Sequence, residues 1–233
     1  MNRRDILHLA LAPGALAVFG ASASEAHAGA AQTAVDLPRR RQVKVAFMIG
    51  ANANVIDTAG PWEVFQDASR RKGPHVFSLY TVAPTRETVV MTGGLRVQPH
   101  YSIADAPQPH VIVVPAQIST EASRAWLARA SANADVTMSV CTGAFQLARA
   151  GLVNSVPVTT HHEFWDAFAR EFPHIELRRG LRFVDSGRIA TAGGLTSGID
   201  LALHIVGRYF GHAVAADTAR YMEHSSEAWA AGA

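Results

Sequence analysis

The stretch Asp135-Val-Thr-Met-Ser-Val-Cys141-Thr-Gly-Ala-Phe-Gln-Leu-Ala148 is the most direct indication of the fold. A β-prone apolar run, residues 136–140, leads straight into Cys141, and a helical pattern over residues 142–150 follows at once, with Gly151 as its C-terminal cap. The sequence therefore predicts a strand that turns sharply into a helix, with the chain's only cysteine on the turn. Open α/β sheets bind their ligands at the carboxyl ends of such strands.

Short apolar runs and helical patterns alternate along the rest of the chain. Strands are expected at residues 42–49, 76–82, 111–114, 136–140 and 156–160, and hairpins at 88–97 and 181–191. Helices are expected at residues 57–71, 120–132, 142–150, 163–171, 197–210 and 214–223. Strands separated by helices favour an α/β fold, in which a mostly parallel sheet is covered by helices on both faces.

The first 28 residues have the layout of a bacterial export signal. Arg3-Arg4 precede an apolar run at residues 6–19, and small residues ending in Ala26-His27-Ala28 follow. This layout predicts a twin-arginine signal cleaved after Ala28, a periplasmic or secreted mature protein, and no stable membrane insertion after cleavage. Residues 29–41 are expected to be a flexible lead-in, and residues 42–233 a single domain.

Composition excludes several kinds of site. A single cysteine excludes an intrachain disulfide and any metal site that needs several thiolates, and the histidines show no convincing ligand spacing, so no metal is expected. The formal net charge is only +2. The one dense basic cluster, residues 39–44, is interpreted as a solvated spacer. A nucleic-acid-binding surface would need basic residues interleaved with aromatic residues on one face, and the sequence has no such stripe, so no nucleic-acid partner is expected.

The predicted position of Cys141 favours a reactive thiol. At the start of a helix, a cysteine faces unpaired N–H groups and the positive end of the helix dipole, which are expected to lower the pKa of the thiol. The same N–H groups could hold an oxyanion. Gly143 is expected to let the helix pack closely on the strand. The alternative interpretation is an inert cysteine that fills the core.

A nucleophilic thiol needs a group that moves its proton. Asp57 opens the helix predicted after the first strand, and His161 follows residues 156–160, so both are expected at the same edge of the sheet as Cys141. Asp57 could equally be a helix N-cap, and His161 a loop histidine. Gly193-Gly194, before the 197–210 helix, is interpreted either as an anion-binding turn or as an ordinary helix start.

These segments together resemble the DJ-1/PfpI superfamily, and within it the isocyanide (isonitrile) hydratase branch. The resemblance runs from about residue 43 to about residue 221, and it implies a flavodoxin-like three-layer sandwich, a homodimer, and no metal or organic cofactor. The motifs that carry it are Cys141-Thr142-Gly143, Asp57-x-x-Gly60-Pro61, Thr159-Thr160-His161 and Gly193-Gly194-x-Thr196-x-Gly198-x-Asp200.

For the chemistry, the resemblance implies that Cys141 is the nucleophile and Asp57 its proton partner, with Thr142 helping to position the reacting groups. Protease-like relatives carry a histidine after the nucleophile, so Thr142 matches the hydratase branch. The implied reaction hydrates a small isocyanide to an N-substituted formamide. Further site candidates are His161, Gly60 and Gly143.

One segment departs from the family pattern. Relatives carry Pro-Gly-Gly after the strand that here ends in Val114-Pro115, whereas this chain continues with Ala116-Gln117. The backbone N–H groups that could hold an oxyanion are those of Ala116, Gln117 and Thr142.

Two other functions remain open on the same fold. A DJ-1-like glyoxalase or deglycase would use His161 to assist Cys141. A non-enzymatic redox or ligand-binding module would use the thiol or the pocket without turnover. Related domains also form the sensor halves of AraC-type transcription regulators, a function against which the predicted export signal argues.

Overall fold

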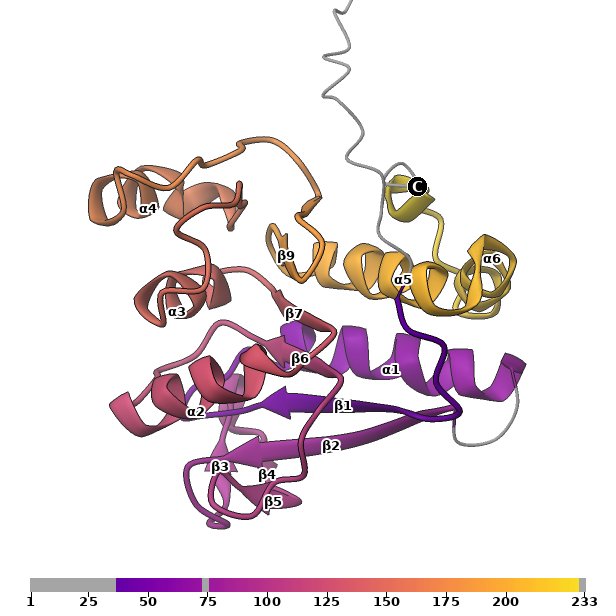
Figure 1. Cartoon of the computed structure of the whole chain (residues 1–233), viewed down its shortest axis with the longest axis horizontal. Helices are drawn as coiled ribbons and strands as arrows, with labels where there is room; N and C mark the ends of the chain where they lie inside the picture. Colours follow the sequence, from indigo (N-terminus) through magenta and orange to yellow (C-terminus); the bar gives the residue numbers. More distant parts are fainter. Residues whose placement is uncertain (1–36, 73–75, 231–233) are drawn as a thin grey trace, which may run out of the picture. The chain divides into compact units, whose positions relative to one another are not determined.

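The central sheet has seven strands in the order β5-β2-β1-β6-β7-β9-β8 (Figure 1), in a computed structural model that describes residues 37–72 and 76–230. Every neighbouring pair in the sheet is parallel except β8 and β9. The strands are β1 (Val43–Met48), β2 (Phe77–Ala83), β5 (Tyr101–Ser102), β6 (Val111–Val114), β7 (Val136–Ser139), β8 (Phe183–Asp185) and β9 (Ile189–Ala192).

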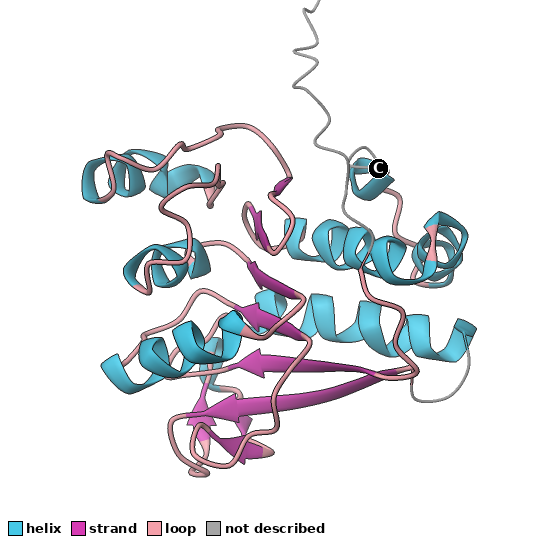
Figure 2. Ribbon diagram, viewed as in Figure 1, coloured by secondary structure: helices cyan, strands magenta, loops and turns pink. Residues whose placement is uncertain are grey.

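Six α-helices of the described residues cover both faces of this sheet (Figure 2). They are α1 (Val55–Lys72), α2 (Glu121–Ala132), α3 (Gly143–Arg149), α4 (Trp165–Glu171), α5 (Ser197–Phe210) and α6 (His212–Tyr221). Helices α1, α5 and α6 contribute to one buried apolar core, and α2, α3 and α4 to the other. Side chains of strand β1 point alternately to the two cores: Val45 and Phe47 pack in the first, and Ala46 and Met48 pack in the second. The predicted flavodoxin-like three-layer sandwich is confirmed.

The strand predicted at residues 156–160 is wrong. This stretch makes only an isolated parallel bridge between Val158 and Leu177, and β9 occupies the position beside β7. Pro157 has no N–H to donate to a ladder, and the N–H of Thr159 bonds to the side-chain oxygen of Thr191 at 2.8 Å instead of to a strand carbonyl. The hairpin predicted at residues 88–97 is confirmed by the antiparallel pair β3 (Val89–Val90) and β4 (Arg96–Val97).

The last five residues of the predicted lead-in, residues 37–41, include contacts with the domain. Leu37 is buried in the first core, and Arg40 binds both oxygens of Asp135 at 2.7 and 2.8 Å. Tyr209 also donates to Asp135, at 2.9 Å. The predicted export signal and residues 29–36 lie outside the described residues. Among the residues that are described, no helix has both the length and the hydropathy to cross a lipid bilayer.

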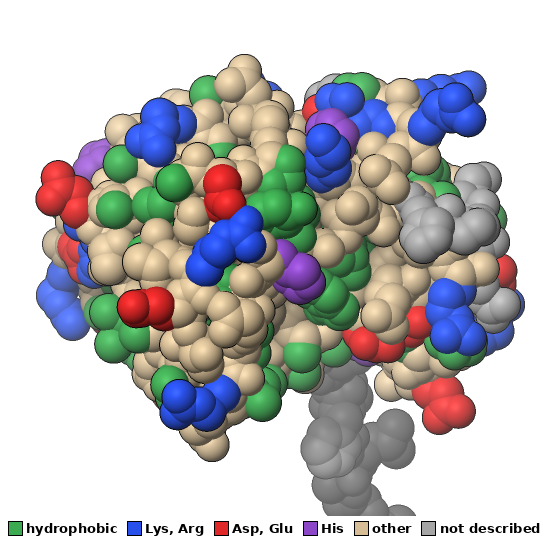
Figure 3. All heavy atoms as spheres, turned by 90° about the horizontal axis from the view of Figure 1, so that it is seen from below, with side chains coloured by type: hydrophobic (Ala, Val, Ile, Leu, Met, Phe, Trp, Pro, Cys, Tyr) green, Lys and Arg blue, Asp and Glu red, His purple; other side chains and the backbone are tan. Residues whose placement is uncertain are grey.

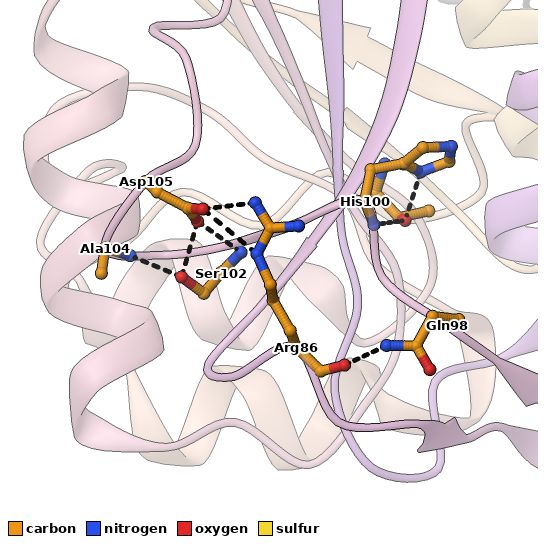
Figure 4. Close-up of polar contacts among 7 residues, drawn as sticks. Arg86, Gln98, His100, Ser102, Ala104 and Asp105 are labelled. Carbon is orange, nitrogen blue, oxygen red and sulfur yellow. Dashed lines mark hydrogen bonds and ion pairs between the residues drawn. The ribbon is translucent and has the colours of Figure 1, made fainter.

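A polar network fastens the chain between β2 and β5 at one edge of the sheet (Figure 4). Arg86 pairs with Asp105, whose Oδ1 accepts the N–H of Ser102 at 2.9 Å and its hydroxyl at 2.6 Å. Gln98 donates its amide N–H to the carbonyl of Arg86, and His100 Nδ1 lies 2.8 Å from the hydroxyl of Thr81.

On the surface seen from below, hydrophobic side chains form a band with charged side chains on both sides (Figure 3).

Candidate active site

Cys141 lies on a sharp bend between β7 and α3, as predicted. Its φ is 57°, in the left-handed region that residues other than glycine rarely adopt. Two hydrogen bonds hold the bend: the N–H of Cys141 donates to Gly193 O at 2.7 Å, and its carbonyl accepts the hydroxyl of Thr160 at 2.8 Å. Strain that is held in this way is characteristic of functional positions.

Glycines permit the close packing around this bend. A Cβ at Gly143 would lie 2.1 Å from the carbonyl oxygen of Val114, so no larger residue fits there, which confirms the predicted close approach of helix and strand. A Cβ at Gly60 would lie 2.9 Å from Ile199, so this site candidate allows α1 to approach α5. Gly60 therefore lets the helix that carries Asp57 pack closely on α5.

Asp57 lies in the first turn of α1 and is fully buried. Its Oδ2 accepts the N–H of Ala116 at 3.1 Å, whereas its Oδ1 has no hydrogen-bond partner among the described residues. Because α1 already begins at Val55, Asp57 is not the cap residue of this helix. Burial raises the pKa of Asp57 to about 6, and the hydrogen bond from Ala116 offsets part of that increase.

Asp57 and Cys141 lie close enough for the carboxylate charge to act on the thiol. Burial, which leaves Cys141 only 7% exposed, and then the Asp57 charge together raise the pKa of the thiol to about 11. The predicted lowering of this pKa is therefore wrong: the sulfur is enclosed beside an anion, and the N–H groups facing it do not compensate. The site holds a neutral thiol next to a carboxylate that is ionised at neutral pH.

Thr142 and Leu195 supply the groups that lower the pKa of the Cys141 thiol. The backbone N–H of each bonds to the sulfur, and so does the Thr142 side chain, which lowers the pKa of the thiol by less than burial raises it. Leu195 has a φ of 53° and was not predicted as a site residue. The only sequence signal was the preceding Gly193-Gly194 turn, which did not indicate that the N–H of Leu195 would face Cys141.

The segment that departs from the family pattern supports Asp57. The N–H of Ala116 is engaged by the carboxylate, and its carbonyl accepts the N–H of Asn54 at 2.8 Å. Gln117 turns its side-chain amide toward Met48 O, at 2.8 Å. Ala116 therefore orients the carboxylate, and the N–H groups of Thr142 and Leu195 face the sulfur of Cys141.

His161 does not bond to Cys141. Its Nδ1 accepts the N–H of Glu163 at 3.3 Å, and its ring stacks on His162 with centroids 4.4 Å apart. The ring lies against Gly194, where a Cβ would be 2.2 Å from His161 Cδ2. His161 therefore covers the loop that leads to Leu195.

A pocket of about 380 Å³ opens over this loop. Three of its lining residues, Thr160, Gly193 and Leu195, also bond to Cys141. The other lining residues are His161, His162, Trp165, Gly180, Leu181, Arg182, Gly194, Thr196 and Ser197. A second, apolar hollow of about 290 Å³ lies between α1 and the β3–β4 hairpin and includes none of the residues that bond to Cys141. In the described part of the chain, no group of three or more His, Cys, Asp or Glu residues is arranged to hold a metal ion.

Two kinds of curated protein are similar to this chain. The HTH-type transcriptional regulator GbdR of Pseudomonas aeruginosa is 26% identical over 182 residues, which are 76% of this chain and 49% of the regulator. This chain thus spans about half the length of that relative. The isonitrile hydratase of Pseudomonas putida is 27% identical over 187 residues, which are 78% of this chain and 76% of the hydratase.

Solved structures show the same fold. A ThiJ/PfpI family protein from Pseudomonas syringae superposes with a TM-score of 0.71 at 23% identity, covering 82% of this chain and 78% of that one. Oxidised DJ-1 from Toxoplasma gondii superposes with a TM-score of 0.64 at 18% identity, covering 79% and 100%. The model of the DJ-1/PfpI family matches residues 43–208, a range that includes both Asp57 and Cys141. This protein therefore belongs to the DJ-1/PfpI family.

Proposed function

We propose that this protein is a cysteine-dependent hydratase that adds water to an isocyanide and releases an N-substituted formamide. The observation that carries the proposal is a buried neutral thiol beside a buried carboxylate with one unpartnered oxygen. An acid with a pKa of about 6 is well matched to taking up and returning protons near neutral pH. Similarity to the isonitrile hydratase of Pseudomonas putida supports the same reaction.

The reaction begins with addition of the thiol. Asp57 takes the proton of Cys141 as the sulfur attacks the terminal carbon of the isocyanide, and then returns that proton to the same carbon. The product of this step is a thioimidate, R–N=CH–S–Cys141. The N–H groups of Thr142 and Leu195 stabilise the negative charge that develops on the sulfur during proton transfer.

Hydrolysis completes the cycle. Water adds to the C=N bond while Asp57 moves one water proton to the nitrogen, which gives R–NH–CH(OH)–S–Cys141. The C–S bond then breaks as the C=O bond forms, and the hydroxyl proton returns to the sulfur through Asp57. The formamide R–NH–CHO leaves, and the thiol and the carboxylate are restored.

The enclosure of the sulfur supports an isocyanide as the electrophile. Cys141 is only 7% exposed, so a reacting group has to be narrow. The terminal carbon of an isocyanide is the end of a linear, uncharged rod, which can reach such a sulfur without bringing a charge to the buried carboxylate.

The direct test is formation of formamide from a small aryl isocyanide by the purified protein, followed by chromatography. The expected result is turnover that is lost in Cys141→Ala and retained in His161→Phe. Turnover of methylglyoxal that needs His161, without formamide from any isocyanide, would instead support a glyoxalase.

A ligand-binding module without turnover is the second candidate function. Similarity to the regulator GbdR favours it, as does a pocket whose residues contact Cys141. Saturable binding of small molecules with no chemical change in any of them would support this candidate over the enzyme.

A further inference from the structure

We propose that the pocket beside Cys141 selects substrates that carry a carboxylate on a flat body, an inference that rests on the function proposed above and names its substrate class. The pocket joins three hydrogen-bond donors, from Arg182, Thr196 and His161, to a wall of aromatic rings. None of the three belongs to the reacting pair Cys141 and Asp57.

Arg182 has donors to spare. A guanidinium carries five N–H groups. Its Nε and Nη2 bond to the buried carboxylate of Asp200, the Nε at 2.8 Å, whereas Nη1 has only a long contact of 3.4 Å to Thr196. The side chain is 41% exposed and lines the pocket, so Nη1 can bind an incoming carboxylate without giving up Asp200.

Thr196 offers a second donor beside the first. It is the residue before α5, yet its side chain makes no capping bond to that helix. Its oxygen instead accepts from Arg182 at 3.3 and 3.4 Å, which leaves its own hydroxyl proton for a ligand. The arrangement lets a carboxylate bind Nη1 and the hydroxyl together.

His161 supplies a third donor and a flat surface. Because its Nδ1 accepts the N–H of Glu163, the neutral ring carries its proton on Nε2, at the side of Gly194 and the pocket. His161 stacks on His162, and His162 packs edge to face with Trp165, at a centroid distance of 6.3 Å. All three rings line the pocket, and a planar body fits against such a wall.

The charges around the pocket favour an anion. Among the described residues, Asp200 is the acid that forms an ion pair with the pocket lining, and both of its oxygens are engaged: Oδ2 by Arg182, and Oδ1 by His224 at 2.9 Å. The residues that line the pocket include no Asp, Glu or Lys. A carboxylate that enters the pocket would thus face the Arg182 guanidinium, whose Nη1 makes no short hydrogen bond. It would not face an acidic side chain, because no Asp or Glu lines the pocket.

The experiment compares matched pairs of substrates. The probes are meta- and para-isocyanobenzoate and their neutral methyl esters, and kcat/KM is measured for each with the full chain. At least one acid is expected to exceed its own ester by about tenfold or more, the effect of one or two hydrogen bonds to a charged group. Thr196→Val and Arg182→Gln are each expected to reduce that ratio several-fold with little change for the ester.

The matched control is Arg178→Gln. Arg178 lies in the same segment as Arg182 and is also paired with an acid, Glu176, at 2.8 Å, but it does not line the pocket. Its loss is expected to leave the acid-to-ester ratio within about twofold, because an exposed charge that is not in contact with the ligand is screened. If Arg182→Gln does not fold, Thr196→Val, which replaces a hydroxyl with a methyl group on an exposed residue, carries the test.

A binding measurement separates this inference from the proposed reaction. The Cys141→Ala variant, which cannot turn over substrate, is titrated by calorimetry with the corresponding formamidobenzoates and their methyl esters. Tighter binding of an acid than of its ester, reduced by Thr196→Val, upholds the carboxylate site even if no isocyanide is converted. Equal binding and equal kcat/KM for acids and esters overturns the carboxylate site, even if isocyanides are converted.

Discussion

Two aspartates of this chain show how the proposed active site differs from the scaffold around it. Asp57 is fully buried and keeps one oxygen unpartnered, and burial raises its pKa to about 6. Asp105, at the sheet edge in Figure 4, is exposed and bonded to Ser102 and Arg86, which lower its pKa to about 2. The difference teaches that a satisfied carboxylate fastens a loop, whereas a carboxylate left short of partners can do proton chemistry.

Replacing the thiol should have the largest effect. We expect Cys141→Ala to reduce formamide formation to the uncatalysed background, because Cys141 is the only thiol of the chain and forms the covalent adduct in the proposed reaction. The rate is followed by chromatography, and unchanged thermal unfolding serves as the control for folding. Activity retained in this variant would contradict the role of Asp57 as well, since the carboxylate would then have no thiol to deprotonate.

Asp57→Asn tests whether the same carboxylate that supports activity also destabilises the fold when it is ionised. We expect kcat/KM to fall by about 10²–10⁴-fold, the usual contribution of a general base. Because the folded state favours the protonated form, ionisation of Asp57 destabilises the fold above about pH 6, and this penalty disappears as the pH falls toward 4.

The same variant should therefore become more stable. A pKa near 6 instead of about 4 corresponds to about 3 kcal/mol, of which the unpartnered amide of asparagine would cancel part. We expect a gain of about 1–2 kcal/mol in the free energy of unfolding at pH 8 and none at pH 4, measured by urea unfolding. A loss of stability at pH 8 would show that Asp57 is a structural residue like Asp105.

Gly143→Ala tests the cramped packing on which the site depends. The added Cβ would meet a backbone oxygen at 2.1 Å, so we expect a loss of about 3 kcal/mol in the free energy of unfolding. The control is Gly93→Ala in the hairpin, where the added Cβ meets nothing within 4 Å and only the φ of 69° is unfavourable, at about 1 kcal/mol. Equal losses in the two variants would mean that the bend at Cys141 has room to relax.

The pH dependence of kcat/KM should follow Asp57. The base form is needed, so we expect activity to be constant from about pH 7 to 9 and to fall about tenfold per pH unit below pH 6. The assay uses an uncharged isocyanide, so that only the protein titrates. A rise in activity near pH 9 to 11 would indicate that the free thiolate of Cys141, and not the pair, is the reactive form.

Asp105→Asn should have the smallest effect. The pKa of Asp105 is lowered, so any stabilisation from its charge is present above about pH 4 and is lost as the pH falls toward 2. Because the ion pair with Arg86 is exposed, we expect a shift of less than about 2 °C in Tm at pH 7 and no change in kcat/KM. A loss of activity would show that the edge network of Figure 4 is coupled to the site.

Local sequence was sufficient for the features that depend on neighbours along the chain. The bend at Cys141 and the need for Gly143 follow from a strand that runs directly into a helix. The strand prediction for residues 156–160 was wrong because this stretch and β9 have equally strong strand patterns. Which of the two pairs with β7 depends on long-range contacts that the local sequence does not reveal.

The electrostatics of the site could not be predicted in the same way. The start of α3 indicated a lowered thiol pKa, but the loop of Leu195 and the carboxylate of Asp57 enclose the sulfur from segments more than fifty residues away in either direction. The position of Asp57 after the first strand predicted the shared sheet edge, but only the family resemblance paired Asp57 with Cys141. Leu195 was missed because its contribution is a backbone N–H, which no side-chain pattern reveals.

The left-handed backbone of Cys141 also limits how this scaffold could change its chemistry in evolution. A β-branched side chain is strongly disfavoured at a φ of 57°, so threonine is a poor replacement there, whereas serine and alanine are sterically acceptable. Homologues that replace Cys141 are therefore expected to carry serine, which can still act as a nucleophile, or alanine, which leaves a pocket that only binds. The backbone bend is expected to be the same in both cases.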